Sequence, residues 1–311
     1  MIKKILKKCK NGLHTIFFKI PNLKFINYQS TLKVRLIDTE LYIEARNLIL
    51  TSYFTSKKDP QRQENTQPDD FEYIKNFYKS IASNGLNALI FHDALSEDFI
   101  KKYANENVQF FKVQLGDYSL NDERFMVYYE FLQQYHFQKI ILCDVSDVVV
   151  NRKDVFEFIK TNKFNIGRDE KSTLKESFWI LDKIDNLPKD IKTKLPVQFY
   201  AMPLVNAGVI GGDYDTMKEF LLKLKNLIAY IDNDLNNNMI CVNLVFFDLY
   251  WRKFINSANF KIKYILNKNY YRKLTENRTL GNRNFHIGVP FVSDFKKHEN
   301  PKDTNHYIYH K

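Results

Sequence analysis

The sequence predicts an α/β protein whose core is a Rossmann-like sheet flanked by helices. Three observations support this prediction. Short apolar runs alternate with segments of helical spacing, two aspartates follow one apolar run directly, and a glycine-rich apolar segment lies further along the chain. Alternating strands and helices are typical of a doubly wound sheet, because each helix returns the chain to the start of the next parallel strand.

The alternation is clearest between residues 47 and 143. The apolar runs are short enough for strands, and the segments between them repeat apolar residues every three or four positions, as a helix with one buried face does. Asn84-Gly85 ends one such segment, and this pair is a good helix C-terminal signal. The expected strands are 47–54, 86–91, 108–113 and 140–142, and the expected helices are 71–83, 96–105 and 121–134.

Two polar stretches interrupt the pattern. Residues 55–68 show no periodicity, and a loop of this length in a compact domain is usually functional or mobile. Residues 171–196 are polar but contain Trp179 and two prolines. We expect this second stretch to form an excursion that covers the functional site. Before it, a short helix at 154–160 and a short strand at 164–167 are expected.

A glycine-containing segment follows the excursion. An apolar run reaches Asn206 and Gly208, a second apolar pair leads to Gly211-Gly212, and a helical pattern begins afterwards. The small residues after Asn206 predict a turn there, and glycines allow a ligand to approach the backbone closely. The segment is not a dinucleotide fingerprint, because the Gly-x-Gly spacing is missing.

The charge of the chain is local. Its 311 residues carry a net charge of +11, which alone would suggest a nucleic-acid partner. Nine of the 47 basic residues precede Asp38, the first acidic residue, and without them the basic residues exceed the 36 acidic ones by only two. We therefore expect no nucleic-acid partner. The three widely spaced cysteines indicate a reducing compartment and neither a disulfide framework nor a zinc site.

Residues 1–21 have the pattern of a basic amphipathic helix. Apolar residues recur at three- and four-residue steps, lysines lie opposite them, and Pro21 follows. Such a helix suits an anionic membrane surface at about 1 kcal/mol per lysine. The alternative is a helix that packs on its own domain with a solvated lysine face. The lysines interrupt any run long enough to cross a bilayer, and no secretory cleavage site is evident.

Two aspartates, Asp144 and Asp147, follow the apolar run 140–142. Ligands of open α/β sheets lie at the carboxyl ends of the strands, so these acids are expected to meet a cation, a ribose or a reacting group. The alternative is that they only cap a turn or a helix. Arg124, in the first turn of the preceding helix, opposes the helix dipole. It is there either for a carboxylate or phosphate, or as a surface residue whose stem packs on the helix.

Four elements in this order resemble the nucleotide-sugar glycosyltransferases of the GT-A fold. The elements are the Asp-x-x-Asp-Val-Val motif at Asp144, the Asn-Ala-Gly segment at Asn206, a Gly-x-Pro element at Gly288 and the terminal His310-Lys311. The resemblance spans residues 47–311 and implies a GT-A domain with a mixed sheet flanked by helices. Residues 1–46 would then be a separate basic segment that includes the membrane-surface helix.

The resemblance also implies roles for individual residues. Asp144, Asp147 and His310 would hold Mn²⁺ or Mg²⁺ on the donor diphosphate, although Asp144 could instead hold the ribose and His310 a phosphate. His286 is a competing candidate for the role of His310. The donor-binding residues would be Thr51, Ser52 and Tyr53 beside the base, and Asn206 and Gly208 along the sugar and acceptor side. Arg124 would orient an aspartate or the diphosphate, and Lys311 would lie beside His310.

The sequence departs from the family pattern at two positions. Ser146 stands where relatives often carry arginine, and Asn238 stands where they often carry aspartate. Since Asn238 cannot act as a base, an inverting enzyme would need another one near the acceptor hydroxyl. Asp169 and Asp248 are the candidates, with Asp248 alternatively a charge on a helix surface. A retaining enzyme would need no such base.

The resulting hypothesis is a cytoplasmic transferase, peripheral to the inner membrane. It would move a sugar from a nucleotide sugar, with UDP-sugar preferred, to a surface glycan such as a lipid-linked or lipopolysaccharide acceptor. Two alternatives remain open. One is a nucleotidyl- or phosphotransferase that uses the same metal site, which the missing phosphate-binding loop motif disfavours. The other is a non-catalytic basic adaptor that binds membrane or RNA.

Overall fold

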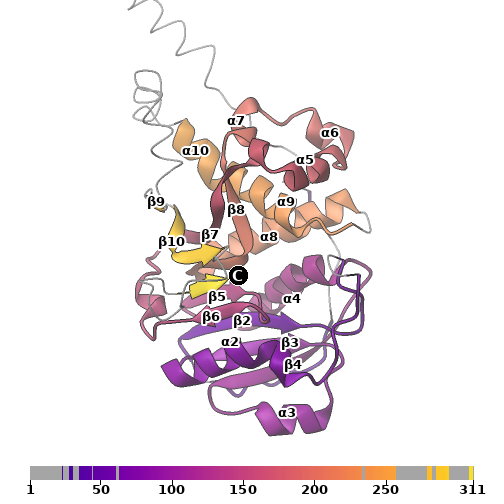
Figure 1. The fold of residues 1–311 in the computed structure, drawn as a ribbon, viewed down its shortest axis with the longest axis vertical. Helices are drawn as coiled ribbons and strands as arrows, with labels where there is room; N and C mark the ends of the chain where they lie inside the picture. Colours follow the sequence, from indigo (N-terminus) through magenta and orange to yellow (C-terminus); the bar gives the residue numbers. More distant parts are fainter. Residues whose placement is uncertain are drawn as a thin grey trace, which may run out of the picture.

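A computed structural model describes residues 23, 28–30, 35–43, 45–60, 63–232, 235–256, 279–281, 285–293 and 308–310. These residues form a mixed β-sheet flanked by helices, which is an α/β fold (Figure 1). Along the sheet the strands follow the order β1-β4-β3-β2-β5-β8-β7-β10-β11-β6, and β9 pairs with β10 at the side. The predicted fold class, a Rossmann-like mixed sheet with helices on its faces, is confirmed.

The N-terminal half alternates strands and helices as the sequence predicts. Strands β2, β3, β4 and β5 pair in parallel, and the apolar runs that form them are almost entirely buried. Side chains cap the connecting helices: the Asp70 carboxylate, the Ser96 hydroxyl and the Ser119 hydroxyl each accept a backbone N–H at a helix start. The elements are β2 (Asn47–Tyr53), α2 (Phe71–Asn84), β3 (Ala88–His92), α3 (Glu97–Tyr103), β4 (Val108–Gln114), α4 (Leu120–Gln134) and β5 (Lys139–Cys143).

The second half adds antiparallel strands to this parallel core. Strand β8 pairs antiparallel with both β5 and β7, while β10 runs parallel to β7 and β11. The last strand, β11, pairs with β10 on one edge and with β6 on the other, and β6 directly follows the two aspartates. The strands are β6 (Val148–Val150), β7 (Phe164–Thr173), β8 (Pro203–Asp213), β9 (Thr279–Gly281), β10 (Phe285–Ser293) and β11 (Ile308–His310).

Helices cover both faces of the sheet. The core on one face contains residues of α4, α8 and α9, and the core on the other face contains residues of α2 and α3. A group of short helices, α5 to α7, lies beyond α9 (Figure 1). The elements of the second half are η2 (Val155–Glu157), η3 (Leu174–Glu176), α5 (Phe178–Asp185), α6 (Lys189–Lys192), α7 (Val197–Tyr200), α8 (Tyr214–Ile231), α9 (Asn238–Phe246), η4 (Phe247–Trp251) and α10 (Arg252–Ile255).

The structure corrects three local predictions. The predicted turn between Asn206 and Gly208 is absent, because both residues lie within strand β8, although the pairing of β8 with β7 shifts register between Asn206 and Ile210. Backbone pairing explains the difference, since Val209 pairs with Cys143 and the Gly208 carbonyl accepts the Asp144 N–H at 3.0 Å. The short strand expected at 164–167 extends to Thr173, and the short helix expected at 154–160 is the single 3-10 turn η2.

The described part of residues 1–46 packs against the domain. Leu23 and Ile43 are buried in its core, and β1 (Arg35–Leu36) pairs antiparallel with β4. The predicted amphipathic helix at 1–21 lies outside the described residues, so its membrane role stays a prediction, as does a boundary at residue 46. Among the described residues, no helix combines the length and apolarity needed to cross a membrane.

Candidate active site

A cleft of about 500 Å³ opens at the carboxyl end of β5. Part of its lining comes from residues between Ser52 and Arg124, on β2, the loop after it, α2 and α4, which we call the N-terminal lining residues. Another part comes from residues from Asp169 onward, on β7, α5, β8, α9 and β11, which we call the C-terminal lining residues. The segment from Asp144 to Asp147 lies along the same cleft, which is where α/β sheets usually bind ligands.

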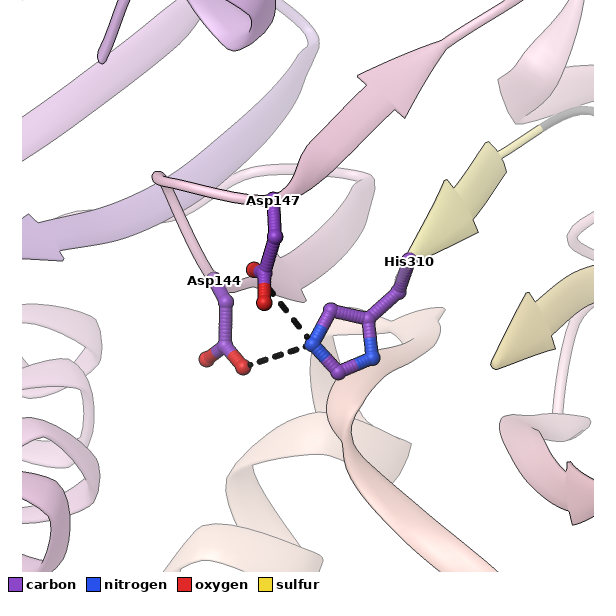
Figure 2. Close-up of side chains that lie close together, drawn as sticks. All are labelled: Asp144, Asp147 and His310. Carbon is purple, nitrogen blue, oxygen red and sulfur yellow. Dashed lines mark ion pairs between the residues drawn. The ribbon is translucent and has the colours of Figure 1, made fainter. Parts of the chain in front are cut away.

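Asp144, Asp147 and His310 converge in this cleft (Figure 2). The His310 Nε2 atom lies 3.1 Å from an Asp144 carboxylate oxygen and 3.4 Å from an Asp147 oxygen. The two aspartates belong to the β5–β6 loop and the histidine to β11, so pairing of β11 with β6 joins residues that are far apart in sequence. The structure therefore brings together the three residues predicted to hold a metal ion.

Gly208 makes room for the histidine. A Cβ built at this position would lie 2.4 Å from His310 Cε1, 2.6 Å from Nδ1 and 2.8 Å from Nε2. The imidazole therefore occupies the space that any other side chain would fill. The sequence predicted Gly208 as a place where a ligand approaches the backbone, and in the structure a metal-ligand candidate occupies that close approach.

Arg124 reaches the cluster from α4. Its guanidinium donates to the Asp144 carboxylate, and the arginine is 8 % exposed. Burial lowers the pKa of Arg124 from its usual value, while nearby Tyr128, Asp122 and Asp147 favour its charged form. Arg124 is therefore not a surface residue whose stem packs on the helix, because it is buried and pairs with a carboxylate. One positive charge thus partly neutralises the two aspartates.

Two acidic residues beside Arg124 fix the start of α4, and the sequence analysis did not single them out. Asp122 is fully buried and accepts the Asn237 N–H with both oxygens at 3.1 Å, which ties α4 to the start of α9. Burial raises the pKa of Asp122 to about 6. Glu123 is also fully buried and accepts two loop N–H groups together with Lys57 Nζ at 2.7 Å.

Amide side chains are found among the C-terminal lining residues. The Asn206 side chain accepts the Gly208 N–H at 2.6 Å and faces the cleft beside Ala207. Asn238 and Met239, at the start of α9, line the same region. The Met239 sulfur lies 3.2 Å from the Ala207 N–H and holds α9 against β8. Asn238, an amide that cannot act as a base, thus lines the cleft.

The residues predicted to flank a base divide between cleft and core. Ser52 lines the cleft, whereas Thr51 is fully buried in β2 and Tyr53 is 1 % exposed. The alternation of side chains along a strand explains this, because neighbours point to opposite faces. Burial raises the pKa of Tyr53 to about 12, and its ring stacks on Tyr73 at a centroid distance of 4.9 Å. Tyr73, which sequence reasoning missed, lines the cleft.

The two candidate bases have different positions. Asp169 lies on β7 and lines the cleft. Asp248 lies in η4 instead, where it pairs with Arg252 at 3.1 Å and lines a separate small pocket beside Leu23. The structure therefore does not bring Asp248 to the site. It is 8 % exposed, so the alternative of an exposed helix charge is not observed either.

The last two predicted site residues are His286, the competing candidate for the role of His310, and Lys311. His286 packs edge-on against Phe158 at a centroid distance of 4.9 Å and is not part of the three-residue cluster. Burial lowers the pKa of His286 to about 4. Lys311 lies outside the described residues, so its predicted position beside His310 stays a prediction.

The donor set fits a divalent cation. One ligand atom from each of Asp144, Asp147 and His310 lies within 4.8 Å of the other two, close enough for a single ion to draw them together. The set leaves room for further ligands, which metals in transferase sites take from substrate phosphates and water. Two carboxylates with an imidazole suit an ion such as Mn²⁺. Among the described residues this is the only such group.

Comparison with known proteins gives matches among solved structures alone. No protein family and no curated protein matches the chain. One similar structure is a crystal structure of the galactosyltransferase LgtC in complex with donor and acceptor sugar analogs, with 11% identity over 78% of this chain and 86% of that chain, and a TM-score of 0.41. Another is an active-site mutant of LgtC, with 10% identity over 85% of this chain and 86% of that chain, and a TM-score of 0.44. LgtC is a glycosyltransferase, the class that the sequence motifs resemble.

Proposed function

We propose that the protein is a metal-dependent glycosyltransferase that uses a nucleotide-sugar donor. The main support is the cluster of Asp144, Asp147 and His310 inside a polar cleft at the carboxyl end of β5. Glycosyl transfer from a nucleotide sugar releases a nucleoside diphosphate, so negative charge develops on the leaving group. A cation held by two carboxylates and an imidazole, together with Arg124, is suited to that charge.

The residues of the site divide three tasks between them in this proposal: holding the metal, orienting its ligands and making room for the histidine. Asp144, Asp147 and His310 would hold Mn²⁺, or Mg²⁺ as the second choice. The bound cation supplies a Lewis acid for the diphosphate oxygens. Arg124 keeps Asp144 in place through its ion pair, and as a lining residue of the cleft it would add a positive charge near the diphosphate. Gly208 leaves the space in which the His310 ring sits.

The N-terminal lining residues suit the nucleoside. Ser52 offers a hydroxyl and Tyr73 an aromatic ring backed by Tyr53, and both line the cleft near the start of α4. Aromatic stacking is a common way to hold a base. A UDP-sugar is the preferred donor in this proposal.

The C-terminal lining residues suit the sugar that is transferred and its acceptor. Asn206 and Asn238 carry amides that can donate to and accept from sugar hydroxyls. Asp169 is the remaining candidate for the base of an inverting reaction, because it is the one of the two predicted bases that lies in the cleft. Its carboxylate would take the proton from the acceptor hydroxyl as that oxygen attacks the sugar.

The acceptor and the location in the cell belong to the same proposal. We infer a surface glycan, lipid-linked or part of a lipopolysaccharide, that is extended at the cytoplasmic face of the inner membrane. The basic pattern of residues 1–21 supports this inference. Deleting these residues and measuring pelleting with anionic liposomes tests it, and unchanged pelleting would contradict a membrane-binding helix.

Hydrolysis of a panel of UDP-, GDP- and CMP-sugars with and without Mn²⁺ tests the main proposal. We expect one nucleotide class to be hydrolysed, with loss of activity on chelation and recovery on adding Mn²⁺. Asp147→Asn should lower the Mn²⁺-dependent rate at least a hundredfold, because it removes a charged ligand. Asp154→Asn is the matched control, since Asp154 pairs with Arg152 and lies outside the cleft.

Three outcomes would contradict the proposal. Release of pyrophosphate from a nucleoside triphosphate would indicate a nucleotidyltransferase instead. Absence of binding and turnover with every nucleotide sugar would remove the transferase assignment. Equal activity of Asp147→Asn and the unchanged protein would show that the cluster does not hold the catalytic metal.

A further inference from the structure

Trp179 is an exposed aromatic residue at the edge of the cleft. The chain has two tryptophans, and they differ sharply in burial: Trp251 is 1 % exposed and Trp179 is 42 % exposed. The indole of Trp179 lines the same cleft as Asp147 and His310. The Lys183 ammonium lies 6.0 Å from the ring centroid, so the ring is flanked by a cation on the surface of α5.

The exposure of Trp179 occurs on a well-anchored helix. Ile180 and Ile184 fix the inner face of α5 in the core, at 0 % and 3 % exposure. The turn before α5 is closed by a capping box, in which the Glu176 carboxylate accepts both the N–H and the hydroxyl of Thr173. Because this turn follows β7, Trp179 is held in a defined position relative to the strand that carries Asp169.

Several of the C-terminal lining residues that accompany Trp179 are polar. Asp169 offers a carboxylate, and Asn206 and Asn238 offer amides. A pyranose ring presents one face of C–H groups and an edge of hydroxyls, so it needs an aromatic surface next to hydrogen-bonding groups. An aromatic ring with carboxylate and amide side chains beside it provides both kinds of contact.

We propose that Trp179 forms the acceptor subsite, on which a pyranose ring of the acceptor glycan stacks. This inference rests on the proposed function and names the acceptor class of the same cleft. In the proposed function the diphosphate and the nucleoside contact the metal cluster, Arg124 and the N-terminal lining residues. The acceptor must meet the sugar end of the donor, and Trp179 belongs to the C-terminal lining residues together with Asp169, the candidate base. A donor-sugar contact of the same ring is the alternative that the experiment excludes or establishes.

Steady-state kinetics separate the two substrates. With a panel of hexopyranosides as acceptors, including methyl β-galactoside, methyl β-glucoside and lactose, Trp179→Ala should raise the acceptor KM about tenfold or more. The donor KM and the rate of donor hydrolysis should stay within twofold of the unchanged protein. Trp179→Phe keeps an aromatic ring and should recover most of the acceptor affinity.

Phe178→Ala is the matched control. Phe178 precedes Trp179 on the same helix and is 89 % exposed, but it does not line the cleft. Its removal tests whether loss of any exposed aromatic residue from α5 changes the kinetics, and the acceptor KM should remain unchanged. An equal effect of the two alanine variants would overturn the assignment to Trp179.

Tryptophan fluorescence gives a readout that needs no donor and no turnover. Titration of the same hexopyranosides should shift or quench the emission of Trp179, since its indole moves from water into contact with a sugar. The response should vanish in Trp179→Phe, in which only the buried Trp251 remains. A response that persists in Trp179→Phe, or no response with any hexopyranoside, would overturn the proposal.

The outcomes keep this inference distinct from the proposed function. Donor hydrolysis that depends on Asp147, together with an unchanged acceptor KM in Trp179→Ala, would leave the transferase intact and reject the acceptor subsite. An increase in the donor KM in Trp179→Ala would assign the ring to the donor sugar and reject the inference as stated. If the unchanged protein binds no nucleotide sugar, the proposed transferase function itself is rejected.

Discussion

The imidazole of His310 lies directly against the backbone of Gly208, where a Cβ would be only 2.4 Å from its Cε1 atom. The same glycine carbonyl accepts the Asp144 N–H at 3.0 Å, so strand β8 holds the loop of the aspartates and supports the histidine. A single residue without a side chain therefore determines how closely β11 and the aspartate loop approach each other.

Gly208→Ala should displace His310 from the cluster. All three of the nearest atoms to the added methyl group would belong to the His310 ring, at 2.4 to 2.8 Å, so the ring or the strand must shift. We expect Mn²⁺ affinity, measured by isothermal titration calorimetry, to fall at least tenfold, together with the metal-dependent rate of donor hydrolysis.

Gly116→Ala is the control for this substitution. A Cβ at Gly116 would lie 3.5 Å from the Glu123 carboxylate, an ordinary contact distance. This variant should keep its Mn²⁺ affinity. Equal losses in the two variants, or unchanged Mn²⁺ affinity in Gly208→Ala, would show that the close approach does not control the metal site.

Lys57→Met should destabilise the loop that follows β2. Lys57 Nζ donates to Glu123 at 2.7 Å and to two backbone carbonyls at 2.6 Å, and the Glu123 side chain is fully buried. Removal of the ammonium leaves a buried carboxylate without its cation, which costs about 2 kcal/mol in the free energy of unfolding. Urea denaturation of the two proteins measures the difference.

The exposed ion pair of Lys75 and Glu72 serves as the control for the destabilisation expected from Lys57→Met. Its two side chains are 36% and 71% exposed, so Lys75→Met should change the free energy of unfolding by less than about 0.5 kcal/mol. Equal destabilisation by Lys57→Met and Lys75→Met would contradict the view that burial of Glu123 makes the Lys57 contact important.

Protonation of His92 should lower the free energy of unfolding in mild acid. Burial lowers the pKa of His92 to about 4, below its usual value of 6.5, and the residue is 2 % exposed. The unfolded chain therefore binds more protons between these values. The contribution of His92 is full above pH 6.5 and is lost as the pH falls toward 4, by about 3 kcal/mol at most.

His92→Gln removes this titration. The free energy of unfolding, measured by urea denaturation from pH 7 to pH 4, should fall less steeply in the variant than in the unchanged protein. Asp122, whose pKa is raised to about 6, acts in the opposite sense, and His286 acts in the same sense as His92. Both are present in the two proteins and cancel in the difference. Parallel pH profiles would contradict a buried, neutral His92.

The sequence predicted the N-terminal half of the fold closely, and local physical rules explain why. Each strand from β2 to β5 contains a short apolar run, and each helix between them begins at a polar cap. Such features depend on nearby residues alone. The pattern near Asn206 predicted a turn where the structure has a strand, because small residues in a strand also allow close packing, as they do at Gly208.

The site was predicted in part, and its remaining residues depend on long-range packing. Asp144 and Asp147 follow a recognisable strand, but only the pairing of β11 with β6 places His310 beside them. Tyr73 belongs to a helix whose apolar spacing predicts burial, and nothing in that spacing shows that its ring lines the cleft. Glu123 and Asp122 were missed because acidic residues in a first helical turn usually serve the helix dipole.

Asp169 and Asp248 can be compared directly as candidate bases. Asp169→Asn should lower kcat for transfer by a hundredfold or more while the donor KM stays unchanged, because a neutral amide cannot accept the acceptor proton. Asp248→Asn should keep kcat, since Asp248 pairs with Arg252 outside the cleft, and should instead lower the free energy of unfolding. Single-turnover rates across pH 5 to 9 and urea denaturation measure the two effects. A kcat for Asp169→Asn equal to that of the unchanged protein would exclude Asp169 as the base and favour a retaining reaction, which requires none at this position.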